Sequence, residues 1–135
     1  MIETLYLHRA HWIKMQHHVS KESPLEACGL LAGAGNRVEE VLSLINAAHS
    51  PVRFRIKPQA QYDAFHWMEA NGLDLVGIYH SHPDGPDTVS VSDIAESAYP
   101  VVNIVWTQNR GIWDAKGYWI EGERVKSVSV QIVGT

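Results

Sequence analysis

Three short, largely apolar runs, each bounded by turn-forming residues, limit most strongly what this chain can fold into. The runs are Ala27 to Ala34, Leu73 to Tyr79 and Val101 to Trp106. Apolar runs of this length between glycine, proline and asparagine residues are typical of buried strands, because a helix needs a longer segment. A sheet of buried strands has to be covered, so the pattern predicts an α/β fold of the α+β type, with a mixed sheet flanked by helices.

The segments between these runs supply the remaining predicted elements. Helical spacing and helix start and stop residues predict three helices: His8 to Val19, Pro58 to Ala70, and a short one from Ser90 that ends before Pro100. Strand-like patterns predict four more strands, the last two as an antiparallel pair: Arg37 to Ile45, Val52 to Ile56, Gly111 to Ile120 and Arg124 to Val133.

Length and charge exclude several classes of protein. The chain has 135 residues, 45% of them hydrophobic, and no linker-like tract, so we expect one domain spanning residues 1–135. Its 11 Lys and Arg against 15 Asp and Glu give a formal net charge of −4, whereas nucleic-acid binding needs a concentrated positive surface. The densest basic cluster, Arg53, Arg55 and Lys57, alternates like one face of a strand. We therefore expect no nucleic-acid partner.

The single cysteine and the absence of long apolar stretches indicate the compartment. Cys28 alone allows no intramolecular disulfide, which is typical of a reducing environment. The first residues contain no uninterrupted apolar run, so no signal peptide is predicted. No stretch approaches the roughly 20 apolar residues that a membrane-spanning helix needs. We expect a cytoplasmic protein with no membrane partner.

Histidine is unusually frequent, with eight in the chain. His80 and His82 are two apart on a predicted extended segment, so their imidazoles project from the same face and can reach one metal ion. Such a pair also arises by chance among eight histidines, and its position is what distinguishes it. It follows a buried strand and precedes a loop, where functional sites are usually held. We expect the four histidines near the N-terminus to face solvent on the first helix: His8, His11, His17 and His18.

A metal site needs a third ligand, because a catalytic zinc ion typically has three protein ligands and one open position. Asp93 is the best candidate, since it lies in the first turn of the helix after the loop, and Asp84 and Asp87 are alternatives within the loop. Ser90 and Asp93 also fit a helix capping box. Capping would compete with metal binding for the oxygens of Asp93. For Ser90, capping is compatible with a hydroxyl aimed at a reacting carbonyl.

Glu26 is the candidate base for a water bound at this site. It stands directly before a buried run, and a solvated strand edge would also explain an acidic residue there. Cys28 lies inside the same apolar run with no histidine tied to it by sequence, so we interpret it as a core residue and not as a nucleophile. Zinc-dependent base deamination needs a P-C-x-x-C element, which a single cysteine cannot supply.

These residues together resemble the signature of the JAMM (MPN-plus, Mov34/PAD-1) metallopeptidases. Glu26 is followed far downstream by His80-Ser81-His82-Pro83, and Ser90-Val91-Ser92-Asp93 follows after the seven residues from Pro83 to Val89. The loop that begins at Asn46 is similar to that of bacterial and archaeal members. The resemblance runs from about Leu7 to Trp106, with Val89 where the family often has proline.

The resemblance implies a single MPN/JAMM domain with a cytidine-deaminase-like mixed sheet flanked by helices. It also implies a Zn²⁺ ion bound by His80, His82 and Asp93. Glu26 is then the general acid/base that acts on the bound water, and Ser90 helps to stabilise the oxyanion.

The implied function is zinc-dependent hydrolysis of a peptide or isopeptide bond at the C-terminal tail of a ubiquitin-like or sulfur-carrier protein. A deubiquitinase-like or desampylase-like isopeptidase is the alternative within the enzyme class. The alternative of another class is a non-catalytic MPN scaffold or metal-binding interaction module. Relatives that serve as scaffolds have lost ligands, whereas this sequence keeps them all, which favours an enzyme.

Overall fold

Within the described part of the chain, seven strands form one mixed sheet that closes on itself in the order β1-β3-β2-β4-β5-β6-β7. The computed structural model describes residues 1–97 and 99–134. The sheet closes because β1 pairs in parallel with both β3 and β7. The strands are β1 Thr4–His8, β2 Cys28–Ala34, β3 Arg37–Leu44, β4 Asp74–His82, β5 Val102–Asn109, β6 Ile112–Glu121 and β7 Arg124–Val133.

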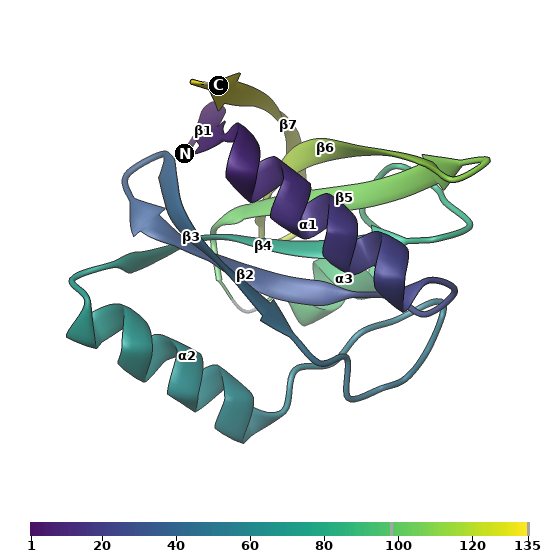
Figure 1. Ribbon diagram of the computed structural model, residues 1–135, viewed down its shortest axis with the longest axis horizontal. Coiled ribbons are helices and arrows are strands. Elements are labelled where there is room, and N and C mark those ends of the chain that lie inside the picture. Colours follow the sequence, from purple (N-terminus) through teal and green to yellow (C-terminus); the bar gives the residue numbers. More distant parts are fainter. Residues whose placement is uncertain (98, 135) are drawn as a thin grey trace.

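Helices cover the sheet from two sides (Figure 1). They are α1 Arg9–Glu22, α2 Pro58–Ala70 and α3 Val91–Glu96. Adjacent residues of β2 serve the two sides, since side chains alternate along a strand: Leu31 packs in the core that α1 covers, and Leu30 packs with Met68 of α2. Full burial contributes about 1.5–3 kcal/mol per leucine side chain. This double coverage confirms the predicted α/β class.

Strand β4 carries the predicted histidines out of the middle of the sheet. It pairs antiparallel with β2 and parallel with β5, and it runs three residues beyond the predicted end at Tyr79, to His82. Tyr79 and Ser81 lie on the side of α1, whereas His80 and His82 project together from the opposite face. Both imidazoles are buried, so the strand brings them to one place.

Local signals predict some elements well. The helix predicted at Pro58 to Ala70 has those bounds, because Pro58 occupies the first turn and Gly72 adopts φ +66° just beyond the end. The first helix begins one residue later than expected, at Arg9, and continues to Glu22. Strands β6 and β7 pair antiparallel as predicted.

One predicted strand is absent from the described residues, and one observed strand is not predicted. Val52 to Ile56 forms no strand, because its backbone bonds to a loop: the Arg55 N–H donates to Asn46 Oδ1, and the Arg55 carbonyl accepts from Ala47 N. Strand β1 was not expected. Its partner over most of its length is β7, at the other end of the chain. Local sequence patterns cannot predict a pairing between such distant segments.

The structure bears on three broader expectations: the role of Cys28, membrane-spanning helices and the single domain. Cys28 is a free, buried thiol, which agrees with its interpretation as a core residue. Among the described residues, no helix is long and apolar enough to span a membrane. The single domain over residues 1–135 stays a prediction, and its positions 98 and 135 lie outside the described residues.

Candidate metal centre

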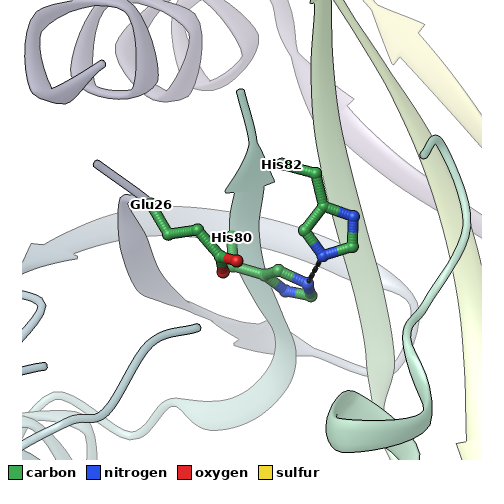
Figure 2. A group of neighbouring side chains, drawn as sticks. All are labelled: Glu26, His80 and His82. Atoms are coloured by element: carbon green, nitrogen blue, oxygen red, sulfur yellow. Dashed lines mark hydrogen bonds between the residues drawn. The ribbon is translucent and has the colours of Figure 1, made fainter. Parts of the chain in front are cut away.

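Glu26, His80 and His82 meet in the interior of the protein. Their exposed fractions are 2%, 0% and 6%, and their potential ligand atoms lie within 4.8 Å of one another. Figure 2 shows the Glu26 carboxylate entering from beside β2 and pointing toward the two imidazoles of β4. Buried carboxylate and imidazole groups that converge in this way form a set that can hold a metal ion.

Asp93 completes a tighter group with the two histidines. Its Oδ2 lies 3.1 Å from His80 Nε2 and 3.2 Å from His82 Nε2, and the two Nε2 atoms are 3.1 Å apart. Oxygen and nitrogen ligands around a tetrahedral zinc ion, at bond lengths near 2.0–2.1 Å, stand about 3.3 Å from one another. The spacing of these three atoms therefore fits a shared metal ion.

The protonation of His82 supports the same conclusion. Its Nδ1 lies 2.8 Å from the carbonyl oxygen of Pro86, which can only accept, so Nδ1 carries a proton. In the neutral ring, Nε2 then presents a lone pair toward His80 and the carboxylate of Asp93. Lone pairs that converge on one point repel each other without a proton or a cation between them. A proton on one Nε2 atom or a bound cation satisfies this arrangement, and the Pro86 carbonyl fixes the orientation of the ring.

Capping and contact with the histidines use the same oxygen of Asp93. Its Oδ2 accepts a hydrogen bond from Ser90 N at 2.8 Å, and Asp93 N donates to Ser90 Oγ at 3.0 Å. Ser90 is thus the N-cap of α3 in a capping box. The same oxygen therefore serves the cap and faces both imidazoles, and competition between capping and metal binding stays a prediction.

The four ionisable groups differ sharply in charge preference. Burial raises the pKa of Glu26 to about 8, with His82 opposing the rise and Asp93 adding to it. Burial also acts to raise the pKa of Asp93, but its contacts with both imidazoles outweigh burial and hold that pKa well below its usual range. Asp93 is therefore the permanent anion of the group, and Glu26 retains a proton near neutral pH.

The two histidines are shifted in opposite directions. Burial lowers the pKa of His80, and contact with Asp93 offsets only part of the effect. Burial acts to lower the pKa of His82 as well, but its contacts with Asp93 and the Pro86 carbonyl raise that pKa overall. A neutral His80 is the form that binds a metal ion.

Glu26 occupies a different position from the other three residues. It is buried, so the alternative of a solvated strand edge is wrong. Among the residues that the structure describes, Glu26 Oε1 and His80 Nδ1 are buried without a hydrogen-bond partner. A carboxylate that faces the metal-binding group yet forms no bond of its own is free to interact with a molecule bound there.

Two residues near the site were assigned no role from the sequence. Asn46 is buried, and its side-chain amide donates to the Glu26 carbonyl at 3.0 Å. Phe54 stacks on the His80 ring, with centroids 4.8 Å apart and an interplanar angle of 26°. Both belong to the loop between β3 and α2. The only sequence signal for this loop was its similarity to bacterial and archaeal JAMM members.

The alternative ligands lie away from the site. Asp87 is half exposed and pairs with Lys116 of β6 at 2.5 Å, and Asp84 is exposed. The loop that contains them still matters, because Tyr118 Oη donates to the Asp87 carbonyl next to Pro86. Neither carboxylate joins the histidines.

The N-terminal histidines follow the expectation only in part. His8 and His17 are exposed, but His11 and His18 are half-buried. A ring nitrogen of His11 contacts the Glu39 carbonyl at 3.1 Å, and His18 Nδ1 lies 2.6 Å from Tyr79 Oη. Solvent exposure is therefore wrong for these two. Each has a separate partner, and they do not converge.

A groove of about 200 Å³ opens beside the metal-binding group. It runs between α2 and α3, and Asp93 belongs to its wall together with Phe54, Arg55, Ile78 and Tyr99. The wall is mainly apolar near β4 and polar toward α3. Of the group formed by His80, His82 and Asp93, only Asp93 lines this groove.

The family comparison covers most of the chain. Residues 8–122 match the family described as prokaryotic homologs of the JAB domain. A desampylase of Pyrococcus furiosus is 33% identical over 124 residues, which is 91% of this chain and 86% of the relative. A probable TtuB-protein conjugate cleaving protease of Thermus thermophilus is 37% identical over 76% of this chain and 69% of the relative. A CysO-cysteine peptidase of Mycobacterium tuberculosis is 32% identical over 71% and 67%.

Solved structures agree with the fold. Protein DSY2949 from Desulfitobacterium hafniense superimposes with a TM-score of 0.87 at 28% identity, covering 98% of this chain and 94% of that one. A JAB1/MPN domain protein from Archaeoglobus fulgidus, AF2198, superimposes with a TM-score of 0.62 at 18% identity, covering 95% and 98%. The second likeness concerns the fold alone.

Proposed function

This chain belongs to the family of prokaryotic homologs of the JAB domain, and from that premise we propose that it is a zinc-dependent hydrolase of peptide or isopeptide bonds. The proposed substrate is the C-terminal tail of a ubiquitin-like or sulfur-carrier protein. Relatives named as desampylase, TtuB-conjugate protease and CysO-cysteine peptidase support this choice. The cytoplasmic location suggested by the single cysteine also remains a prediction.

We assign the metal to His80, His82 and Asp93. Their three facing atoms are 3.1–3.2 Å apart, and two imidazoles with one carboxylate are a donor set that suits zinc. Bound there, Zn²⁺ would polarise a carbonyl and bring the pKa of a water molecule toward about 7. Glu26 could also serve as third ligand by distance, but Asp93 is the permanently charged carboxylate and is fixed by the capping box.

Glu26 is assigned the proton transfers. It must take a proton from the attacking water and return it to the leaving amine, which requires a carboxyl that gains and loses a proton near neutral pH. In the metal-free protein burial raises the pKa of Glu26 to about 8, and the charge of a Zn²⁺ ion bound at the neighbouring histidines would lower it toward the range in which the carboxyl can accept a proton. Its unpartnered Oε1 faces the site, and no protein group has to be displaced before it acts.

Ser90 is assigned to the oxyanion. Its Oγ accepts a hydrogen bond from Asp93 N, and this bond leaves the hydroxyl hydrogen free to donate. A donor aimed at the oxygen on which charge develops stabilises the transition state more than the ground state. The same side chain therefore caps α3 and serves the reaction.

The convergence of a charged Asp93 and two imidazoles beside a free, buried Glu26 carries the proposal. The test is Glu26→Gln, which keeps the shape but removes the proton acceptor. We expect hydrolysis of a ubiquitin-like carrier with a C-terminal extension to fall by about 10²- to 10⁴-fold. Zinc content, measured by elemental analysis, should stay at one ion per chain.

The matched control is Glu22→Gln, an exposed carboxylate on α1, which should change neither property. A scaffold would show no hydrolysis in the unchanged protein and no response to Glu26→Gln in binding. Loss of zinc in Glu26→Gln would instead make Glu26 a ligand and contradict the assignment.

A further inference from the structure

Asn46, two residues beyond β3, forms an unusually complete set of hydrogen bonds for a loop residue. Its side chain is buried, and all of its partners are backbone groups. The amide nitrogen donates to the carbonyls of Glu26 and Arg53 at 3.0 Å each, with the Ser50 carbonyl at 3.5 Å. Its Oδ1 accepts from the N–H groups of Ala48 and Arg55 at 3.0 Å each. One amide thus joins Glu26, two residues before β2, to the loop that follows β3.

This loop holds the backbone of Glu26 from both directions. The Glu26 carbonyl bonds to Asn46, and the Glu26 N–H donates to the Ser50 carbonyl at 2.9 Å. The next peptide is fixed as well, because Ala27 N donates to Ser81 Oγ at 2.8 Å. The carboxylate oxygen Oε1 has no partner of its own. Its direction therefore depends on how firmly the backbone at Glu26 is held.

The same loop also forms one wall of the site. Phe54 lies between two residues whose backbones bond to Asn46, and it stacks on His80. A displacement of the loop would move both the aromatic wall and the Glu26 backbone. Misplacement of a reacting group by about 1 Å is enough to slow catalysis by about 10²-fold.

We propose that Asn46 is a positioning residue that sets the direction of the Glu26 carboxylate through the backbone. This inference rests on the proposed function, because it assigns Asn46 an effect on the proton transfers of Glu26. The hydrogen bonds of the Asn46 side chain go to backbone groups and not to the side chains of His80, His82 or Asp93. It acts by fixing the loop against the start of β2.

The test is Asn46→Asp, which keeps the size and the acceptor oxygens but removes the N–H donors to Glu26 and Arg53. We expect kcat to fall by about 10- to 100-fold while KM and zinc content stay within about twofold. The probe is a ubiquitin-fold carrier fused through a Gly-Gly tail to a reporter protein. Amide hydrogen exchange at Glu26 should accelerate, since its acceptor loop is loosened.

A double-mutant cycle separates positioning from a general loss of stability. In a Glu26→Gln background, Asn46→Asp should change the residual kcat by less than about twofold. Asn71→Asp, which alters an exposed amide bonded to the Trp67 carbonyl at the end of α2, is the control and should have no effect. Asn46→Gln, which displaces the same amide by one methylene, replaces Asn46→Asp if that protein does not fold.

An unchanged kcat in Asn46→Asp, or an equal fall in both backgrounds, would overturn the positioning role. Failure of the proposed function looks different, because the unchanged protein would then neither retain zinc nor cleave the fusion.

A second inference rests on charge. The segment from Val41 to Tyr62 contains no acidic residue, although the chain has a net charge of −4. Within it, Arg53, Arg55 and Lys57 are all exposed, and we call them the basic row. Among the described residues, no ion pair includes any of the three.

The position of the basic row is set by the residues between its members. Phe54 turns inward onto His80, and Ile56 packs with the apolar cluster under α2. The charged side chains are therefore left on the outside of the loop. Arg55 also belongs to the wall of the groove beside Asp93. A molecule lying in the groove can contact Arg55, and Arg53 and Lys57 lie two residues to either side of it along the chain.

We infer that the basic row binds acidic side chains of the substrate protein next to its flexible tail. This inference deepens the proposed function by naming the charge of the partner surface. A single exposed ion pair contributes little, and three acting together are expected to change affinity about tenfold. Complementary charges also raise the rate at which the two proteins associate and orient them as they meet, and salt weakens both effects.

The experiment uses zinc-loaded Glu26→Gln protein and two synthetic peptides that end in Gly-Gly. The peptides differ only in whether the upstream residues are Glu or Lys, and fluorescence anisotropy measures binding at low and high salt. We expect the Glu peptide to bind about tenfold more tightly at low salt and the preference to shrink at high salt. The combined R53E, R55E and K57E protein should prefer the Lys peptide.

The control is the R124E and K126E protein, which reverses two exposed charges on β7 and should keep the wild-type preference. Equal binding of the two peptides by the unaltered row would overturn the inference. Zinc content and cleavage of the fusion would be unaffected by that result, so it would leave the proposed function standing.

Discussion

Two histidine pairs of this chain, His80 with His82 and His17 with His18, lie in contrasting surroundings. His80 and His82 are two apart on a strand, so their Nε2 atoms come within 3.1 Å and meet the carboxylate of Asp93. His17 and His18 are adjacent on α1, where successive side chains point about 100° apart. His17 is exposed and His18 turns inward to Tyr79. The difference shows that spacing and a shared acidic neighbour, and not the number of histidines, bring side chains together into a candidate metal site.

The largest expected effect comes from removing one imidazole of each pair. We predict that His82→Ala loses stoichiometric zinc and that hydrolysis falls by about 10³-fold or more, since the metal provides the main electrostatic stabilisation. His17→Ala should retain the zinc and the activity of the unchanged protein. Elemental analysis and cleavage of a carrier fusion measure both.

Equal zinc content in His82→Ala and His17→Ala would show that the two histidine pairs do not differ in metal binding. It would mean that the ion is bound elsewhere, and the assignment of His80, His82 and Asp93 would fail with it.

Sequence reasoning could identify the strand pair because its signals are local. The apolar run before His80 and the spacing of the motif predict a strand end with two histidines on one face. The burial of Glu26 is not local. It depends on the loop after β3, which Asn46 ties to the Glu26 carbonyl. Position alone therefore favours a solvated edge for Glu26, and only the family resemblance implies a catalytic role.

The same non-local bonding explains the wrong strand at Val52 to Ile56. Its alternating residues do point to opposite sides, with Phe54 inward and the arginines outward. The backbone, however, bonds to Asn46 and Ala47 in place of a neighbouring strand. Strand β1 was missed for the complementary reason, because its partners in β7 are at the far end of the chain. Alternation reports exposure and not hydrogen-bond partners.

The next effect concerns Ser90, the N-cap of α3, which holds Asp93 beside His80 and His82. Ser90→Ala removes both the cap of α3 and the proposed oxyanion donor. We expect kcat to fall by about 10²- to 10³-fold and the free energy of unfolding to fall by about 1 kcal/mol. Ser90→Thr keeps the hydroxyl and should recover most of both losses.

Ser92→Ala is the matched control, because Ser92 is exposed on the same helix. If Ser90→Ala lowers stability but leaves kcat unchanged, Ser90 is only a cap.

A smaller effect is expected in the metal-free protein, where the free energy of unfolding should depend on pH in opposite directions through Glu26 and through His18. Burial raises the pKa of Glu26 from 4.5 to about 8, so between these values the unfolded chain ionises while the folded chain keeps its proton. Stability from this group is full below pH 4.5 and is lost as pH rises toward 8. Wild-type protein should therefore lose stability relative to Glu26→Gln across this range, as measured by urea unfolding with chelator present.

His18 on α1 has the opposite sign. Burial lowers the pKa of His18, with Glu22 opposing the shift, so its folded state loses stability as pH falls below 6.5. Parallel curves for wild type and Glu26→Gln from pH 4.5 to 8 would contradict a buried, protonated Glu26.

The smallest expected effect concerns Tyr79, which contacts His18 and directly precedes the proposed ligand His80. It tests whether a change at Tyr79 leaves zinc binding unaffected. Tyr79 Oη contacts His18 Nδ1 at 2.6 Å and donates to Ser43 Oγ at 3.0 Å, on the face of β4 opposite His80. Tyr79→Phe removes only this hydroxyl, so we expect a loss of about 1 kcal/mol in the free energy of unfolding. Zinc content and kcat should remain within about twofold, because alternation along the strand separates the two faces. A fall in zinc affinity would mean that the strand transmits displacements from one face to the other, and the two histidine pairs would then belong to one coupled unit.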